Sequence, residues 1–211
     1  MARYAGATCR LCRRVGDKLM LKGERCYTAK CAVERRNAPP GQHGTGSRRR
    51  PKKSDRGIQL QHKQKARYTY GILERQFRKT FAEAERLPGV TGETLLVLLE
   101  RRLDNVVFRL GFGTSRAQAR QLVRHGHISL NGRKTDVPSC LIAENDVIAW
   151  RETSTKSEYY KALAQEIKNR IIPAWLSLDT EKLIGKVLRL PTAADIEAKF
   201  DEMAIVEYYS R

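Results

Sequence analysis

The chain has 211 residues, of which 41 are lysine or arginine and 23 are aspartate or glutamate, so its formal net charge is +18. A repulsive charge of this size needs an acidic partner, and the two abundant ones are nucleic acid and anionic membrane. The longest aliphatic run, Leu95 to Leu99, is far shorter than the ~20 residues that cross a bilayer, which sets membranes aside.

The positive charge is concentrated near the start of the chain. Residues 1–53 carry a net charge of +12, two thirds of the excess. This asymmetry predicts a basic N-terminal arm attached to a more balanced body. The first residues contain no apolar block of signal-peptide length, so we expect a cytoplasmic protein with reduced thiols.

Four cysteines lie in this basic region as C-x2-C-x13-C-x4-C: Cys9, Cys12, Cys26 and Cys31. Two close pairs separated by a loop are the pattern of a tetrahedral metal site, and the metal would replace a missing apolar core. Two disulfides or four unrelated thiols are the alternatives. The pattern predicts one structural Zn²⁺; a [4Fe–4S] cluster is the alternative metal group, although its usual cysteine spacing is tighter.

Residues 37–54 are rich in proline, glycine and basic side chains and have no apolar periodicity. A solvated linker is one interpretation, but five basic residues occupy the six positions from Arg48 to Lys53. Clustered basic residues gain free energy by releasing counterions from a polyanion. We therefore expect this basic arm to contact RNA phosphates.

Helical patterns follow from about residue 57. Residues 58–70 read as a polar, basic helix, and an apolar stripe at spacings of four, four and three predicts the next helix, ended by Pro88-Gly89. From Thr94 to Leu110 the apolar residues fall on one broad face. This periodicity predicts one continuous helix that ends at Gly111.

A short helix with an arginine stripe is predicted over Arg116–His125. Ser115 and Gln118 have the spacing of a capping box, in which each side chain bonds the backbone N–H of the other. Three arginines recur every four residues along one face: Arg116, Arg120 and Arg124. A solvated charged face is the ordinary alternative, but the helix contains no acid three or four positions away to pair with them. We expect the stripe to face phosphates, which guanidinium groups bind bidentately.

Strands are predicted after this helix. His127–Leu130 alternates as a strand, Asn131-Gly132 has the signature of a two-residue hairpin turn, and Val147–Trp150 reads as a further strand. Arg133 and Lys134 continue the positive charge beyond the turn. The helix, hairpin and strand predict a compact α+β module.

The last quarter of the chain, residues 152–211, has a net charge of −1. Apolar spacing predicts one helix near residues 159–167, two strands near 175–178 and 186–190, and a strand over 204–209. The acidic residues here are either ordinary surface or a face that meets a basic protein.

A resemblance emerges from longer motifs. The segment Arg102-Leu-Asp-Asn-Val-Val-Phe-Arg-Leu-Gly-Phe, followed by the run from Ser115 to Lys134, closely resembles the RNA-binding domain named after the bacterial small-subunit ribosomal protein S-four. The remaining motifs extend the resemblance to the whole ribosomal protein family: Pro39-Pro-Gly-Gln-His-Gly, Tyr70-Gly-Ile-Leu-Glu-Arg-Gln-Phe, Trp175-Leu-Ser-Leu-Asp and Tyr208-Tyr-Ser-Arg.

Together these features predict an α+β fold: a mostly helical domain plus a small helix-helix-hairpin RNA-binding domain, with an N-terminal four-cysteine metal knuckle and basic arm. The expected divisions are a metal-binding segment at 1–45 and a basic arm and helical domain at 46–94. An S-four-type RNA-binding domain follows at 95–160. Residues 161–211 are expected to pack back on the helical domain.

The resemblance implies a non-enzymatic structural constituent of the small ribosomal subunit. Family members bind the 5′ domain of 16S rRNA first and nucleate its assembly. They lie beside the channel through which mRNA enters, contact ribosomal protein S-five and other small-subunit proteins, and contribute to translational accuracy. Some repress their own mRNA, and many lack the cysteines. We expect a cytoplasmic, ribosome-bound protein that is not a homo-oligomer.

Two other function classes fit the sequence less well. An RNA-modifying or tRNA-charging enzyme with the same small domain would need a catalytic constellation, which the sequence does not offer. A zinc-finger DNA regulator would suit the cysteine spacing, but no dimer or major-groove recognition unit follows.

The predicted metal ligands are the four cysteines above, and no residue is predicted to be catalytic. The RNA-binding residues predicted from charge, position and resemblance are Arg3, Arg10, Arg13, Arg14, Arg35, Arg36, Gln42, His43, Arg48, Arg49, Arg50, Lys52, Lys53, Lys63, Arg67, Ser115, Arg116, Gln118, Arg120, Arg124, His125, Asn131, Arg133 and Lys134.

Overall fold

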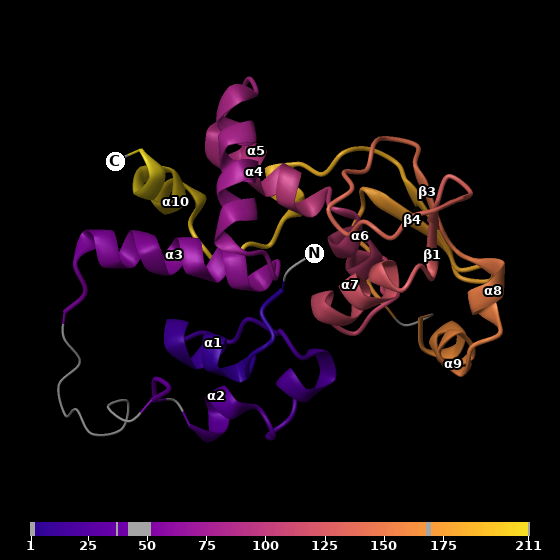
Figure 1. The fold of residues 1–211 in the computed structure, drawn as a ribbon, viewed down its shortest axis with the longest axis horizontal. Helices are drawn as coiled ribbons and strands as arrows, with labels where there is room; N and C mark the ends of the chain where they lie inside the picture. Colours follow the sequence, from indigo (N-terminus) through magenta and orange to yellow (C-terminus); the bar gives the residue numbers. More distant parts are fainter. Residues whose placement is uncertain (1–2, 37, 42–51, 168–169, 211) are drawn as a thin grey trace. The chain divides into compact units, whose positions relative to one another are not determined.

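The computed structural model describes residues 3–36, 38–41, 52–167 and 170–210 (Figure 1). The chain forms two compact units: an N-terminal unit, Met1–Leu95 with Ala198–Arg211, and a sheet unit, Leu96–Glu197. Within the described ranges, no helix combines the length and the apolar character needed to cross a bilayer.

The N-terminal unit is helical. Its elements are α1 (Cys9–Val15), the 3-10 helix η1 (Gly23–Cys26), α2 (Ala32–Arg35), α3 (Asp55–Thr69), α4 (Glu74–Arg86), the first half of α5 (Thr91–Glu100) and α10 (Glu202–Tyr209). The predicted helices near residues 58–70 and 73–87 are confirmed as α3 and α4. The stripe of α4 is core, with Phe77, Phe81 and Ala84 buried.

The predicted strand over residues 204–209 is wrong, because this segment is the helix α10. Asp201 caps it, accepting hydrogen bonds from the backbone N–H groups of Met203 and Ala204. α10 packs along α3 (Figure 1), and the ring of Tyr209 lies 4.6 Å from that of Phe81. A short apolar run suits either a strand or a buried helix, and here the cap and the packing surface decide for the helix.

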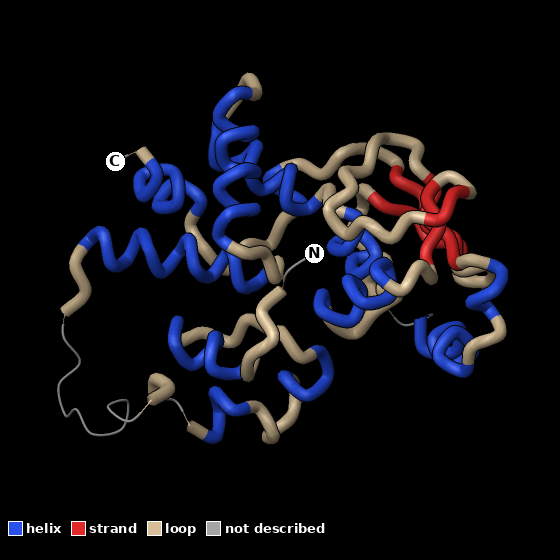
Figure 2. The backbone as a smooth tube through the Cα atoms, in the orientation of Figure 1, coloured by secondary structure: helices blue, strands red, loops and turns tan. Residues whose placement is uncertain are grey.

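The sheet unit combines short helices with one antiparallel sheet (Figure 2). Its helices are α6 (Leu103–Arg109), α7 (Arg116–Arg124), α8 (Glu152–Thr155), α9 (Glu158–Glu166) and the 3-10 helix η4 (Ala193–Asp195). The strands are β1 (Ile128–Leu130), β2 (Arg133–Lys134), β3 (Val147–Trp150), β4 (Leu176–Asp179) and β5 (Ile184–Val187), in the order β2-β1-β3-β5-β4.

The hairpin prediction is confirmed. β1 and β2 pair antiparallel with Leu130 opposite Arg133, and the turn residues Asn131 and Gly132 have φ angles of 51° and 76°. Both angles lie in the left-handed region that a type I′ turn requires, which asparagine and glycine tolerate best. The predicted strand near 175–178 is confirmed as β4, whereas its partner β5 begins at Ile184 and ends at Val187, earlier than the predicted 186–190.

The predicted single helix from Thr94 to Leu110 is wrong, because α5 ends at Glu100 and α6 begins at Leu103. Arg102 is extended, with φ −66° and ψ 136°, and forms an isolated bridge with Leu141. The Leu103 N–H donates to the Cys140 carbonyl at 2.8 Å. Tertiary pairing with this distant segment interrupts a periodicity that is helical on both sides.

The structure divides the predicted C-terminal segment 161–211 between the two units. Residues up to Glu197 belong to the sheet unit, where β5 pairs with β3 in the register Ile148 opposite Gly185. Only the part from Ala198 onward joins the helical packing of the N-terminal unit. The pairing of β5 with β3 therefore places most of the predicted C-terminal segment in the sheet unit, although its composition differs from that of the preceding residues.

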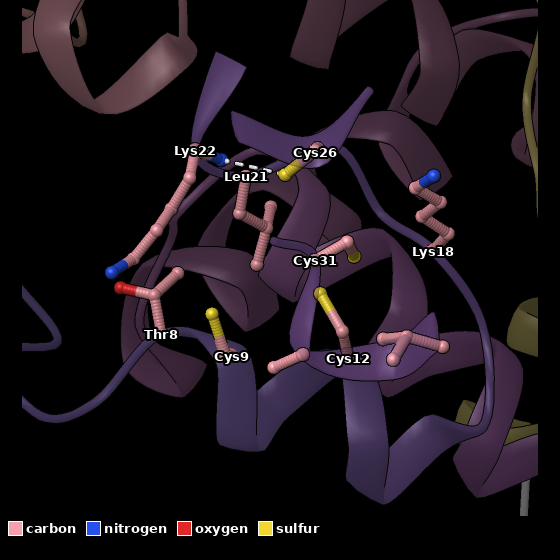
Figure 3. A pocket seen from close by; sticks show the side chains of 10 residues that line it. Thr8, Cys9, Cys12, Lys18, Leu21, Lys22, Cys26 and Cys31 are labelled. Carbon is pink, nitrogen blue, oxygen red and sulfur yellow. Dashed lines mark hydrogen bonds between the residues drawn. The ribbon is translucent and has the colours of Figure 1, made fainter. Parts of the chain in front are cut away.

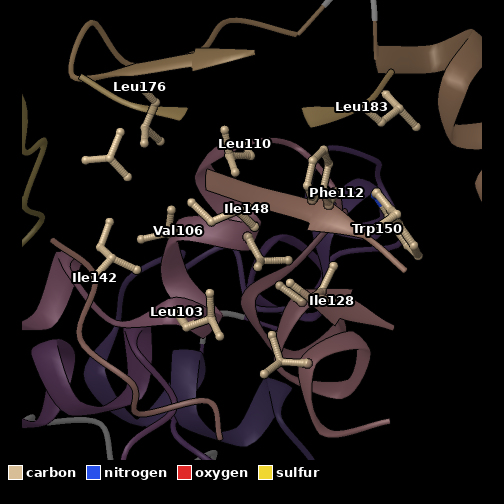
Figure 4. Close-up of a cluster of buried hydrophobic side chains, with 14 of the residues drawn as sticks. Leu103, Val106, Leu110, Phe112, Ile128, Ile142, Ile148, Trp150, Leu176 and Leu183 are labelled. Atoms are coloured by element: carbon tan, nitrogen blue, oxygen red, sulfur yellow. The ribbon is translucent and has the colours of Figure 1, made fainter. Parts of the chain in front are cut away.

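One apolar core holds the sheet unit together (Figure 4). It combines side chains of α6 and α7 with those of the sheet and of α9, and its largest members are fully buried: Phe112, Leu103, Leu110, Ile128, Ile142, Ile148, Ile167, Trp175 and Leu183. Each such side chain stabilises the fold by about 1.5–3 kcal/mol relative to exposure. The core thus gives α7 a rigid base.

Gly113 allows α7 to approach this core closely. A Cβ atom at this position would lie 2.9 Å from the backbone nitrogen of Ala119 and 3.2 Å from its Cα. The backbone of α7 cannot move away from the added methyl group without breaking helical hydrogen bonds. We therefore expect Gly113→Ala to destabilise the sheet unit by about 1–3 kcal/mol. Urea denaturation followed by tryptophan fluorescence measures the change, and an unaltered midpoint would contradict the tight approach.

Candidate nucleic-acid interface and cysteine cluster

Helix α7 begins at the predicted cap. The Ser115 hydroxyl accepts a hydrogen bond from the Gln118 backbone N–H at 3.3 Å, so the N-cap prediction is confirmed. The predicted reciprocal hydrogen bond, from the Ser115 backbone N–H to the Gln118 side chain, is wrong. The Gln118 side-chain oxygen instead accepts from the Thr114 N–H and hydroxyl, both at 2.7 Å. Ser115 is buried and both side chains order the helix start, while their predicted contacts with RNA stay a prediction.

The arginine stripe is not a row of unpaired cations, and this prediction is wrong for two of its three members. Arg120 is buried and donates to Asp104 Oδ2 at 2.7 Å. The same carboxylate accepts two hydrogen bonds from Arg102, at 3.0 and 2.8 Å. Asp104, Arg102 and Arg120 thus form a buried ion-pair cluster that ties α6 to α7.

Arg116 belongs to a second buried polar cluster. Its Nε donates to Asn105 Oδ1 at 2.7 Å, and its guanidinium lies 4.6 Å from the centre of the Phe108 ring. Glu100, fully buried, lies 3.8 Å from Arg116 and accepts two hydrogen bonds from Arg109, both at 2.9 Å. Glu100 and Asp104 each lie 16 residues before the stripe arginine that they face, beyond the range of a search within one helix.

One group of exposed cations of the sheet unit lies at the end of α7 and on the hairpin, apart from the exposed Lys156, Lys161, Lys182, Lys186 and Arg189 of the same unit. We define the α7–hairpin surface by its four exposed basic residues: Arg124, His125, Arg133 and Lys134. Gly126, with φ +71°, ends the helix, and a Cβ there would lie 2.7 Å from the Cε of Lys134. The Lys134 side chain therefore lies across the end of α7, which joins helix and hairpin into one surface.

The electrostatics of His127 reflect this density of positive charge. Burial lowers the pKa of His127, and the charges of His125 and Arg151 lower it further. His127 Nδ1 lies 3.0 Å from the Ser154 hydroxyl. Asn131, which is predicted to bind RNA, also braces the turn: its amide donates to Asp146 Oδ1 and its oxygen accepts from the Val147 N–H, both at 2.8 Å.

A cavity of about 330 Å³ opens beside the hairpin. It is lined by both polar and apolar side chains: Ser129, Gly132, Lys134, Trp150, Arg151, Glu152 and Thr153. The position of Lys134 places this cavity directly beside the α7–hairpin surface.

Two predicted contacts on α3 serve the packing of the N-terminal unit. Lys63 is buried and its Nζ lies 2.8 Å from Glu74 Oε1 and 4.8 Å from the centre of the Tyr208 ring. Arg67 donates to Glu74 at 3.3 Å. Burial alone would raise the pKa of Glu74, but hydrogen bonds from Lys63 and Tyr209 hold it below its ordinary value. Lys63 and Arg67 therefore fix α3 against α4 and α10.

The other predicted basic contacts of this unit have different settings. Arg13 is half-buried and donates to the backbone carbonyls of Ala38 and Pro39, at 2.8 and 3.3 Å. The exposed ones are Arg3, Arg10, Arg14, Arg35, Arg36, Lys52 and Lys53. Five further predicted residues lie outside the described part of the chain: Gln42, His43, Arg48, Arg49 and Arg50.

The four cysteines come together. Cys9, Cys12, Cys26 and Cys31 line one small pocket between α1, η1 and the start of α2 (Figure 3). Cys12, Cys26 and Cys31 are buried and Cys9 is half-buried. The Lys22 backbone N–H lies 3.4 Å from the Cys26 sulfur. The buried apolar cluster of this basic segment has only three members in the described part of the chain, Cys12, Val15 and Leu19. The side chains of the four cysteines line the pocket beside it.

The neighbouring cysteines affect the pKa of Cys12 electrostatically. Burial raises the pKa of Cys12, a hydrogen bond from the Leu19 backbone lowers it, and the charges of Cys26, Cys9 and Cys31 raise it again. A metal ion is the group that would reverse this effect, because it stabilises thiolates. As the side chains are placed, however, no three His, Cys, Asp or Glu side chains in the described ranges come close enough together to hold a metal ion.

Comparison with known proteins covers the whole chain. A family model described as "Ribosomal protein S4/S9 N-terminal domain" matches residues 3–100, and one described as "S4 domain" matches residues 101–148. The protein named small ribosomal subunit protein uS4 of Dehalococcoides mccartyi (strain CBDB1) is 58% identical over 211 residues, which cover all of both chains. Those of Halothermothrix orenii and Pelotomaculum thermopropionicum are 55% and 56% identical over the same length. The chain therefore belongs to the ribosomal S4 (uS4) family of small-subunit ribosomal proteins, structural and non-enzymatic components of the ribosome.

Proposed function

We propose that the chain is a primary binder of the 16S rRNA 5′ domain, and that it nucleates assembly of this domain in the small subunit. The observation that carries the proposal is the α7–hairpin surface: exposed cations on elements that buried ion pairs hold rigid. Pre-ordered cations lose little entropy when they bind phosphates, and their favourable term is counterion release.

The two arginine clusters beneath the surface have a supporting role in this proposal. Arg120 and Arg116 hold α7 against α6 through Asp104 and Asn105, so their charges are partly neutralised inside the unit. The RNA then meets Arg124, Arg133 and Lys134 first. Of the three arginines in the predicted stripe, Arg116 and Arg120 therefore hold the helix in place, and Arg124 contacts the RNA.

We also propose that Cys9, Cys12, Cys26 and Cys31 hold one structural metal ion, Zn²⁺, with a [4Fe–4S] cluster as the alternative. The support is that four thiols line one pocket in a segment with little apolar core. When bound, the metal would cross-link α1, η1 and α2 and replace the missing core. All four positions are protein thiols, which is typical of a structural site.

The finer family roles stay proposals for this chain. They are a position beside the channel through which mRNA enters, a contribution to translational accuracy with ribosomal protein S-five, and repression of its own mRNA. Residues 152–211 carry ten acidic and nine basic side chains, which makes this part of the chain the better candidate for contacts with basic ribosomal proteins. Contacts to these proteins and to 16S rRNA would place the chain on the ribosome.

The RNA-binding proposal predicts a loss of affinity without a loss of fold. We expect the triple variant Arg124→Ala, Arg133→Ala, Lys134→Ala to bind a folded 5′-domain rRNA fragment at least 10-fold more weakly. Its salt slope should fall by about 2–3, because each phosphate contact contributes about 0.7–0.9 to the slope of log K against log salt. Filter binding over a series of salt concentrations measures both quantities.

A matched variant controls for net charge. Lys161→Ala, Lys182→Ala, Lys186→Ala removes three exposed cations from elsewhere in the same unit and should leave affinity and slope nearly unchanged. Equal losses of RNA affinity in both triple variants would show that binding depends on net charge and not on the α7–hairpin surface. Preference for duplex DNA over folded rRNA in competition would favour the DNA-regulator reading instead.

A further inference from the structure

The last two cysteines of the cluster bracket an exposed turn. Cys26 and Cys31 are only 8% and 7% exposed, whereas every residue of Tyr27–Lys30 is exposed. The turn therefore projects to solvent from two buried ends.

Hydrogen bonds within the turn order its backbone. The Tyr27 N–H donates to the Glu24 carbonyl at 2.9 Å, and the Thr28 hydroxyl donates to the Arg25 carbonyl at 3.1 Å. The Cys31 N–H donates to the Thr28 carbonyl at 3.0 Å. A side chain on this turn is thus presented from a fixed backbone.

Tyr27 is the unusual residue of this turn. Its side chain is 74% exposed, so the ring contributes little apolar burial to the fold. Exposed basic residues flank it in sequence, at Lys22, Arg25 and Lys30. An aromatic ring among cations is the composition of surfaces that bind unpaired nucleotides, where the ring stacks on a base and the cations bind the adjacent phosphates.

The surrounding charge strengthens this reading. Residues 3–36 contain ten basic and three acidic side chains. Two of the three acids already have lysine partners: Glu34 pairs with Lys18 at 2.5 Å, and Asp17 pairs with Lys65. The segment that carries Tyr27 therefore presents a strong excess of positive charge to its partner.

We propose that Tyr27 is a stacking platform for an unpaired RNA base, with Arg25 and Lys30 binding the phosphates beside that base. This inference rests on the proposed rRNA-binding function and adds a second contact site, on the cysteine-rich segment. Tyrosine has only two side-chain torsions, so stacking orders it at small entropic cost. The excess of basic side chains in residues 3–36 favours RNA over a protein partner, because RNA supplies a phosphate beside every base.

The test separates stacking from charge by salt dependence. With the full-length protein and a folded 5′-domain rRNA fragment, we expect Tyr27→Ala to lower affinity about 10-fold at every salt concentration and to leave the salt slope unchanged. Tyr27→Phe should bind like the wild type, and Tyr27→Leu like Tyr27→Ala. The pair Arg25→Ala, Lys30→Ala should instead lower the slope by about 1–2.

Val90→Ala is the control, because Val90 is a 53% exposed apolar residue of the same unit that lies outside the basic segment. Wild-type affinity in Tyr27→Ala overturns the platform, and so does full affinity in Tyr27→Leu, since a flat ring would then be unnecessary. A wild-type protein whose RNA affinity does not respond to salt overturns the proposed function itself, and this inference with it.

Discussion

Asp104→Ala should destabilise the sheet unit by about 3–5 kcal/mol, the range expected when one partner of a buried ion pair is removed. The carboxylate of Asp104 accepts hydrogen bonds from Arg102 and Arg120, whose residues are 3% and 8% exposed. Without it, two guanidinium groups stay buried after losing the carboxylate that they share. Urea denaturation followed by tryptophan fluorescence measures the effect, because both tryptophans, Trp150 and Trp175, lie in this unit.

The matched control is Asp136→Ala, which removes an exposed carboxylate of the same unit and should change stability by less than about 0.5 kcal/mol. Equal effects of the two variants would refute the anchoring role of Asp104. The same logic changes the interpretation of arginine variants. Arg120→Ala is expected to weaken RNA binding through loss of helix packing, whereas Arg124→Ala is expected to act on binding alone.

Replacing Cys9 and Cys12 by serine should release about one equivalent of metal per chain and loosen residues 3–36. Structural zinc contributes about 10–16 kcal/mol in small zinc-dependent domains, far more than the few apolar contacts of this segment supply. We expect faster amide hydrogen exchange there, with the denaturation curve of the sheet unit unchanged. Metal analysis of the purified protein and exchange mass spectrometry provide the two measurements.

Cys140→Ser is the control, since Cys140 lies in the other unit and outside the pocket of the four cysteines. Full metal content in the double variant, or no metal in the wild type, would refute the metal site. Loss of fluorescence-detected structure in the sheet unit would refute the independence of the segment. Its contacts with α3 include the bond from Gln61 Nε2 to the Val15 carbonyl at 2.5 Å and the packing of Tyr68 against Cys12, Val15 and Leu19.

Local signals in the sequence were reliable where the interaction itself is local. The helices α3 and α4, the Ser115 cap and the Asn131-Gly132 hairpin follow from side-chain periodicity and backbone preferences over a few residues. The four-cysteine spacing predicted a metal site; the four thiols do line one pocket, and the metal itself stays a prediction. Full-length resemblance supplied the family, which the comparisons confirmed.

The roles of charged side chains depended on distant partners. Arg120 and Lys63 are predicted from the sequence to contact RNA, and the structure buries each against an acid from another helix, Asp104 and Glu74. Pairing at 11 and 16 residues leaves no periodic signature. Similarly, the apolar residues around Arg102 continue a helical pattern, but pairing with the segment at Leu141 breaks the helix.

The sequence by itself thus determined the polyanionic class of partner, the family, the principal helices and the hairpin, since composition and short-range spacing carry this information. Only the tertiary structure decided which cations remain exposed to meet RNA. Burial makes an unpaired charge costly, so cations that enter the fold are matched to acids, and the α7–hairpin surface and the Tyr27 turn are left facing outward.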